Sequence, residues 1–135
     1  MIQRIQTVFL ALVLLFNIGF VFTPLFAEAL AFPNDWLIFL LAGALTLSSV
    51  LSLLAIFQYK NRKLQSKNVL LAMIGQVIAL GTAAGILFSM GAWDTGSIGE
   101  IGSALLLLIG WICQLLANRA IKKDEKLIKS MDRIR

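Results

Sequence analysis

The sequence has 135 residues, of which 59% are hydrophobic and only 14% are charged, and its mean hydropathy is +0.89. Because a soluble domain carries about 25% charged residues, this composition excludes an ordinary water-soluble fold and indicates a protein that lies in lipid. The sequence contains no His and one Cys, Cys113, which excludes imidazole metal sites, His-ligated haem and an intrachain disulfide. We therefore expect neither a cofactor nor a metal.

Four long apolar stretches reach the roughly 17 to 25 residues that a helix needs to cross the hydrocarbon core of a bilayer. Glu100, at the mouth of the last stretch, is the only charged residue in any of them. The remaining residues form two tails and three loops, which leave no room for a soluble domain. We predict an all-α membrane protein with one domain, residues 1–135, in which four transmembrane helices form an antiparallel bundle. The predicted spans are residues 7–27, 36–59, 69–90 and 98–117.

The first span has some features of a signal peptide, since Arg4 precedes it and small residues follow at its end. Its apolar run is longer than the roughly 7 to 15 residues of a signal-peptide core, so we interpret it as a transmembrane helix. Asn17 lies near its middle, where an amide usually bonds a neighbouring helix or its own backbone. Pro24 is close enough to the outer end to bend or finish the helix there.

All 12 Lys and Arg residues lie in three places, although the net charge is only +5. These places are Arg4, the connection between the second and third spans, and the tail after residue 117. The other two connections carry acids and no cation. Because Lys and Arg near span ends resist translocation, we predict that both termini and the central loop are cytoplasmic. We expect this basic face to attract anionic lipid rather than nucleic acid; its central-loop residues are Lys60, Arg62, Lys63 and Lys67.

Small residues recur every four positions on the second and third spans. Such stripes let helix backbones approach closely in a membrane. The two stripes overlap in depth when counted from the central loop, so we expect the second and third spans to pack against each other through them. Homodimerisation and a groove for a partner helix are the alternatives. The residues are Ala44, Ser48 and Ser52 on the second span, and Gly81, Gly85 and Ser89 on the third.

Gln76 is a second polar residue within a span. It precedes Gly81 by five residues and therefore points about 140° away from the small stripe of its helix. Its neighbour is then the first span, the fourth span or a separate subunit. We regard Gln76 and Asn17 as candidate contacts to a partner.

The tail, residues 118–135, contains neither Gly nor Pro and is predicted to continue the fourth helix into the cytoplasm. Its apolar residues fall on one arc of an amphipathic helix. Asp124 lies in the middle of this arc, where a carboxylate either stays wet or meets a Lys or Arg. This favours docking onto protein, either the central loop of the same chain or a partner, over adsorption on anionic lipid. The candidate contacts of this segment are Ile121, Asp124, Leu127, Ile128 and Met131.

Three segments carry a resemblance to a known family: the opening MIQRIQTVFL, the loop KNRKLQ and the closing LANRAIKKDEKLIKSMDRIR. The whole chain resembles an uncharacterised family of four-span inner-membrane proteins of the Bacteroidota. The resemblance implies a bacterial cytoplasmic membrane with both termini inside. It brings no activity or catalytic residue, and the matching tail residues Asn118, Arg119, Asp124 and Glu125 have no role to carry over.

We expect a non-catalytic accessory or scaffold subunit of a larger inner-membrane complex, with other integral membrane proteins as partners. Protein-export and respiratory assemblies are both candidate hosts. The alternative is a small transporter or channel that acts as a homo-oligomer, in which Asn17, Gln76, Thr82 and Gln114 line the path of a neutral solute. A membrane enzyme is the least favoured class, because its chemistry would depend on four acids near the outer surface, Glu28, Asp35, Asp94 and Glu100.

Overall fold

The computed structural model describes residues 2–31, 35–91 and 98–134, and within them the regular structure is entirely helical. The predicted all-α class is therefore confirmed for these residues. The outer turn with Asp94, and the side chain of Asp35, lie outside what the structure describes. The helices are α1 (Ile2–Val21), α2 (Pro24–Ala31), α3 (Asp35–Phe57), α4 (Arg62–Ser89) and α6 (Ile98–Asp132).

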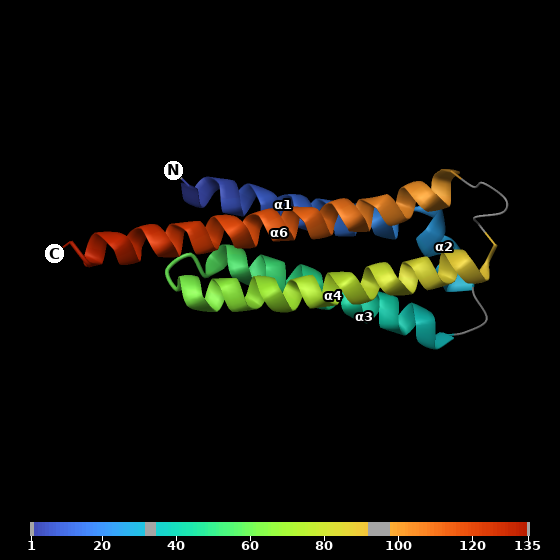
Figure 1. Ribbon diagram of the computed structural model, residues 1–135. Coiled ribbons are helices and arrows are strands. Elements are labelled where there is room, and N and C mark those ends of the chain that lie inside the picture. The colour runs from blue at the N-terminus through green and yellow to red at the C-terminus, as the bar shows by residue number, and fades with distance from the viewer. Residues whose placement is uncertain (1, 32–34, 92–97, 135) are drawn as a thin grey trace.

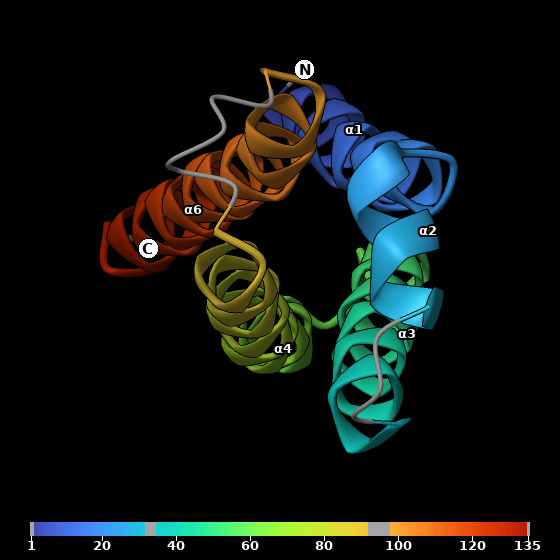
Figure 2. The same ribbon diagram turned by 90° about the vertical axis from the view of Figure 1, so that its right-hand side faces the viewer.

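The four long helices run up and down beside one another (Figure 1). Each contacts two neighbours, in the order α1, α3, α4, α6 and back to α1, so they surround a common axis (Figure 2). The N-terminus, the C-terminal part of α6 and the α3–α4 connection lie at one end, which we call the termini end (Figure 1). The short helix α2 crosses the opposite end, which we call the α2 end (Figure 2).

Among the described residues, three helices are long and apolar enough to cross a membrane: α3 from Trp36, α4 and α6. The pair formed by α1 from Ile5 and α2 also qualifies together, but its two parts are bent by 53°. The part of the chain that the structure describes thus offers three spans, or four if the bent pair makes one span. The α3 helix ends two residues earlier than the predicted span 36–59, at Phe57.

Pro24 explains why the expected helix 7–27 is two helices. Because Pro has no N–H, residue 24 cannot donate a hydrogen bond to the Phe20 carbonyl four residues earlier. Thr23 Oγ1 donates to that carbonyl instead, at 2.6 Å, and closes the end of α1. Pro24 then begins α2, a position where the missing N–H has no helical partner to lose.

The connection between α3 and α4 is shorter than the polar gap in the sequence predicts, because α4 begins at Arg62. Asn61 caps α4, since its Oδ1 accepts a hydrogen bond from the Leu64 N–H at 3.3 Å. Two further bonds close the hairpin, from Gln65 Nε2 to the Ala55 carbonyl at 2.9 Å and from Asn68 to Gln58 at 2.7 Å. Most of the basic stretch that was expected to be a loop is therefore the first two turns of a helix.

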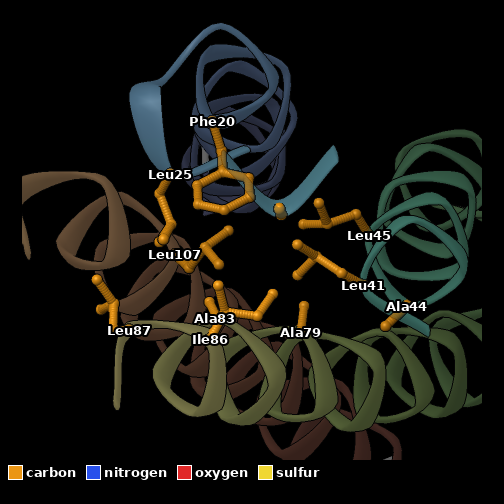
Figure 3. Packing of buried hydrophobic residues seen from close by; sticks show 11 residues of the cluster. Phe20, Leu25, Leu41, Ala44, Leu45, Ala79, Ala83, Ile86, Leu87 and Leu107 are labelled. Carbon is orange, nitrogen blue, oxygen red and sulfur yellow. The ribbon is translucent and has the colours of Figure 1, made fainter. Parts of the chain in front are cut away.

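Two apolar clusters fill the interior. The distal cluster, near the α2 end, gathers side chains from every described helix around Phe20 and Leu107 (Figure 3). Its other members include Leu25, Leu41 and Ile86. The proximal cluster, nearer the termini end, consists of Leu10, Ala55, Val69, Ala117 and Ile121.

Candidate functional site

The side chain of Gln76 lies inside the bundle and is 0% exposed. Its Nε2 donates hydrogen bonds to Asn17 Oδ1 of α1 at 3.0 Å and to the Leu107 carbonyl of α6 at 3.2 Å. Its Oε1 accepts a hydrogen bond from Ser48 Oγ of α3 at 2.8 Å. The sequence left the neighbour of Gln76 open. In the structure this side chain contacts three helices of the same chain, α1, α3 and α6.

The same network extends to a second buried amide. Gln114 Nε2 donates to Ser48 Oγ at 2.8 Å and to Ser52 Oγ at 3.3 Å. Asn17 Nδ2 donates to Ser49 Oγ at 3.1 Å. These bonds link all four long helices through side chains. We call the set the polar core layer: Asn17, Ser48, Ser49, Ser52, Gln76 and Gln114.

The polar core layer separates the two apolar clusters. On α4, Gln76 lies between Val69 of the proximal cluster and Ala79 of the distal cluster. A polar group surrounded by apolar contacts has a low-dielectric environment, in which its hydrogen bonds are strong and an unmade bond is costly. The layer therefore restricts the rotation and depth of each helix to the arrangement in which the donors and acceptors meet.

Two glycines make the close approaches that this arrangement needs. A Cβ on Gly75 would lie 3.1 Å from the Ala44 carbonyl oxygen and 3.4 Å from the Ser48 nitrogen. A Cβ on Gly110 would lie 3.2 Å from Gln76 Nε2. Gly75 therefore allows the backbones of α3 and α4 to meet, and Gly110 leaves room for the Gln76 amide.

The predicted pairing of the two small stripes is wrong within the chain. Ala44, Ser48 and Ser52 of α3 are buried as expected, but Ala44 and Ser48 face Gly75 of α4, and Ser52 accepts a hydrogen bond from Gln114 of α6. Gly81, Gly85 and Ser89 are exposed, and nothing lies within 4 Å of a Cβ built on either glycine. The reason is the rotation of α4. Once the hydrogen bonds of Gln76 turn that side chain inward, a residue five positions later points about 140° away.

Asp124 provides a second buried polar contact, toward the termini end. It is 5% exposed. Its Oδ2 accepts a hydrogen bond from Gln6 Nε2 of α1 at 2.7 Å and lies 3.3 Å from Arg62 Nη1 of α4. The carboxylate in the apolar arc of the tail thus joins α6 to two other helices. Arg62, whose side chain is 22% exposed, supplies the opposite charge and stays partly hydrated.

Four of the candidate partner contacts are therefore engaged within the chain: Asn17, Gln76, Ile121 and Asp124. For Gln76 and Asp124 this is the intrachain alternative that the sequence left open beside a separate partner, and the side chains of all four are buried against helices of the same chain. Leu127, Ile128 and Met131 are exposed, by 46%, 38% and 63% respectively. The arc of the tail thus splits into a part that docks on the bundle and a part that does not.

Three polar residues of this end were missed by the sequence interpretation: Gln6, Gln65 and Ser66. Ser66 Oγ bonds Asn118 Oδ1 of α6 at 3.1 Å, which ties α4 to α6. Gln65 and Ser66 were assigned to a loop because charges surround them. A signal was present in the spacing, since Gln65 and Gln76 are eleven residues apart and share one face of a helix.

The cations of the termini end are mostly exposed. Lys60, Lys63 and Lys67 all face outward. A shallow hollow of about 350 Å³ lies between the start of α4 and the end of α6, and it includes Lys60, Lys63 and Lys129. Lys129 Nζ lies 2.8 Å from Glu125 Oε1, and this hydrogen bond, with the nearby positive charge, lowers the pKa of the Glu125 carboxyl.

The described residues include no group of three or more His, Cys, Asp or Glu side chains that could hold a metal ion. Thr82, which the channel hypothesis placed along a path, donates its hydroxyl to the Ile78 carbonyl of its own helix at 2.8 Å. Three buried side-chain atoms of the described chain have no hydrogen-bond partner: Glu28 Oε2, Trp111 Nε1 and Gln114 Oε1.

Comparison with known protein families matches residues 2–134 to the family described as Domain of unknown function (DUF4293). This match covers nearly the whole chain and agrees with the resemblance to an uncharacterised family. Comparison with curated proteins and with solved structures finds no match.

Proposed function

Since the chain belongs to the DUF4293 family, whose function is unknown, we propose from the geometry that it is a four-span scaffold subunit of a complex in the bacterial cytoplasmic membrane. In this proposal α1 and α2 together form the first span, and the bend at Pro24 lies near the outer surface. The termini end is cytoplasmic. The subunit has no catalytic role and holds other integral membrane proteins in place.

The membrane orientation is supported by the position of the cations. The α3–α4 connection, which carries Lys60, lies at the same end as both termini (Figure 1). The tail of α6 at this end carries a further set of Lys and Arg residues. Lys and Arg residues near span ends usually stay on the cytoplasmic side, and here they gather at one end of the bundle, so this end is the cytoplasmic one in the proposal. At about 1.5 Å per residue, α6 is also longer than a hydrocarbon core of about 30 Å requires.

The observation that supports the scaffold proposal most is that the side chains of the polar core layer form hydrogen bonds with one another, inside the bundle. Gln76, Gln114 and Ser48 are each 0% exposed. Every one of them donates to another group of the same chain. A solute path needs polar groups that can exchange partners with the solute. Side chains already bonded across four helices favour a rigid bundle, and so support a structural role over transport.

The surface that we propose for partner contact is the exposed end of α6. Leu127, Ile128 and Met131 form an exposed apolar arc, in which Ile128 also lines the hollow beside the start of α4. Because an apolar stripe on an otherwise charged helix is a common docking device, this arc suits a groove in a cytoplasmic or membrane-embedded partner. The exposed face of α4 around Gly81 and Gly85 offers a second contact, within the membrane, for another helix or another copy.

The test is purification of a tagged chain from its native membrane in mild detergent, with mass spectrometry of the companions present in stoichiometric amount. We compare the wild type with the double variant Ile128→Glu and Met131→Glu. The control is Ser130→Glu, which adds a carboxylate about 130° around the helix from the middle of that pair. The proposal expects a defined companion that is lost from the double variant and kept by the control.

A clean monomer or homodimer, recovered from every form, contradicts the scaffold proposal. Orientation is tested separately in a Cys113→Ser background with a single Ser130→Cys label site. A membrane-impermeant maleimide applied to intact cells should not label this site, and should label it after the inner membrane is opened. Labelling in intact cells contradicts the cytoplasmic position of the termini end.

A further inference from the structure

An apolar groove of about 490 Å³ runs along the outside of the bundle between α4 and α6. This volume is within the range of about 300–1,000 Å³ that is typical of small-molecule sites. Trp111 forms the α6 wall, and its indole N–H is buried without a hydrogen-bond partner among the described residues. The α4 wall consists of Leu70, Met73, Ile74, Val77 and Ile78.

Both walls of the groove continue into cations toward the termini end. On α4, Lys67 precedes Leu70 by three residues and Ile74 by seven, so the three share one face. On α6, Lys122 follows Trp111 by eleven residues, about three turns, and points within about 20° of it. Arg119 lies one turn before Lys122 on the adjoining part of this surface.

The hydrogen bond between Ser66 and Asn118 sets the relative depth of the two walls. It pairs the residues that directly precede Lys67 and Arg119, so these two cations lie at about the same level. Arg119 and Lys122 also line a surface hollow of about 310 Å³. Within the described chain, neither they nor Lys67 belong to an ion pair. Three cations without a counter-charge thus gather at one end of an apolar groove.

The distance from Lys67 to the far end of the groove matches one leaflet of a bilayer. Lys67 and Ile78 are eleven residues apart, about 16 Å along a helix. Half of a hydrocarbon core of about 30 Å is about 15 Å. A chain that starts at the cations and follows the groove to Ile78 therefore runs from the headgroup level to about the middle of the membrane.

We propose that this groove binds one anionic phospholipid. Its phosphate lies between Lys67 and Arg119, with Lys122 nearby, and one acyl chain follows the α4 wall past Trp111. Arg119 offers the planar pair of N–H donors that suits a phosphate. A transmembrane helix of a partner would fill the apolar part but leave the cations uncompensated, so charge complementarity favours the lipid. The proposal rests on placing the bundle in a bilayer, as in the proposed function.

The experiment uses the fluorescence of Trp111 in lipid nanodiscs. Trp36→Phe and Trp93→Phe leave Trp111 as the only Trp of the full chain. The probe is phosphatidylglycerol with brominated acyl chains, added at low mole fraction to phosphatidylcholine, because bromine quenches an indole on contact. We expect stronger quenching than with the same fraction of brominated phosphatidylcholine.

The charge variant combines Lys67→Gln, Arg119→Gln and Lys122→Gln in the same single-Trp chain. Each cation near an anionic headgroup contributes about a fivefold factor in binding, so the preference for phosphatidylglycerol should fall by about that factor per substitution. The matched control removes three other cations of the termini end, Lys60→Gln, Lys129→Gln and Arg133→Gln. It should keep the preference, because it lowers the general surface charge but leaves the groove intact.

Equal quenching by the two brominated lipids would overturn the proposal, and so would equal loss of preference in both triple variants. Absence of quenching by either lipid would show that another helix covers the groove, which also overturns it. Failure of the wild type to enter nanodiscs would instead contradict the membrane placement of the proposed function. Circular dichroism of each variant verifies that its helices are intact.

Discussion

Gln76 of α4 donates a hydrogen bond to Asn17 of α1 at 3.0 Å, across 59 residues of sequence and through the middle of the bundle. Neither side chain has water available if the bundle is in lipid. Each therefore depends on the other, and on the serines of α3, for its hydrogen bonds. The relationship explains why two amides are tolerated inside apolar helices.

The coupling between these two residues is measurable. Interhelical hydrogen bonds in membranes contribute about 0.6 kcal/mol on average and up to about 1.7 kcal/mol. We expect Asn17→Ala and Gln76→Ala each to lower the free energy of unfolding, and a double-mutant cycle between them to give a coupling energy in that range. The measurement is reversible unfolding in mixed detergent micelles. Thr46→Ala is the control, because the Thr46 hydroxyl bonds only carbonyls of its own helix. Strictly additive effects would show that the hydrogen bond contributes nothing.

The glycines of α4 should respond in opposite ways to alanine. Gly75→Ala places a Cβ 3.1 Å from the Ala44 carbonyl oxygen, a backbone atom that cannot move aside alone. We expect destabilisation of about 1–3 kcal/mol, as for overpacking of a core. Gly81→Ala enters open space and should be neutral or slightly stabilising, since Ala is the better helix former. The midpoints of thermal unfolding compare the two. An equal loss at both positions would contradict the rotation of α4 described above.

A bulkier change at the exposed glycines separates folding from association. Gly81→Leu together with Gly85→Leu should leave the stability of the monomer unchanged, because both sites face outward. If this face holds a second copy or a partner helix, the same variant should reduce association, since small residues allow close helix contact. Single-molecule photobleaching in liposomes counts the chains per particle. The comparison variant Ile74→Ala lies on the same face but makes its side chain smaller instead of larger. It should therefore keep the association.

Removal of the Asp124 carboxylate should loosen the end of α6. Asp124→Ala removes the hydrogen bond from Gln6 and the ion pair with Arg62. Breaking a buried pair costs about 3–5 kcal/mol, but Arg62 is partly exposed and can rehydrate, so we expect a loss of about 1–2 kcal/mol. Hydrogen exchange of residues near Ile121 reports the local opening. Glu125→Gln, which removes a surface ion pair with Lys129 and a weaker attraction to Lys63, should change exchange there very little.

The bend between α1 and α2 has a local cause that a single substitution tests. Pro24→Ala restores an N–H that can bond the Phe20 carbonyl, so we expect a smaller bend than 53°. Spin labels at Leu15 and Leu30, both exposed, measure the change in a Cys113→Ser background. The distance between the labels should increase as the helices straighten. An unchanged distance would mean that packing of α2 against its neighbours, and not Pro24, holds the bend.

The all-helical chain and its apolar helices of membrane-spanning length were predictable from the sequence, because hydropathy and helix length are local properties that neighbouring helices do not alter. Span 36–59 differs from α3 by a few residues at its ends. The start of α4 was placed too late, because charges around Lys63 were interpreted as a loop. A charged segment is equally compatible with a capped helix, and Asn61 supplies the cap.

The face of each helix that lies inside the bundle follows from contacts between distant segments. Two faces of α4 could lie inside the bundle: the face with the small residues around Gly81, and the face with Gln76. The periodicity of the sequence is compatible with either. The Gln76 face lies inside because the Gln76 amide forms hydrogen bonds with groups on three helices there. A buried amide without such bonds is strongly unfavourable. Asp124 likewise depends on Gln6, 118 residues away in the chain. Contacts of this kind exist only when distant segments meet, so they follow from packing and not from local pattern.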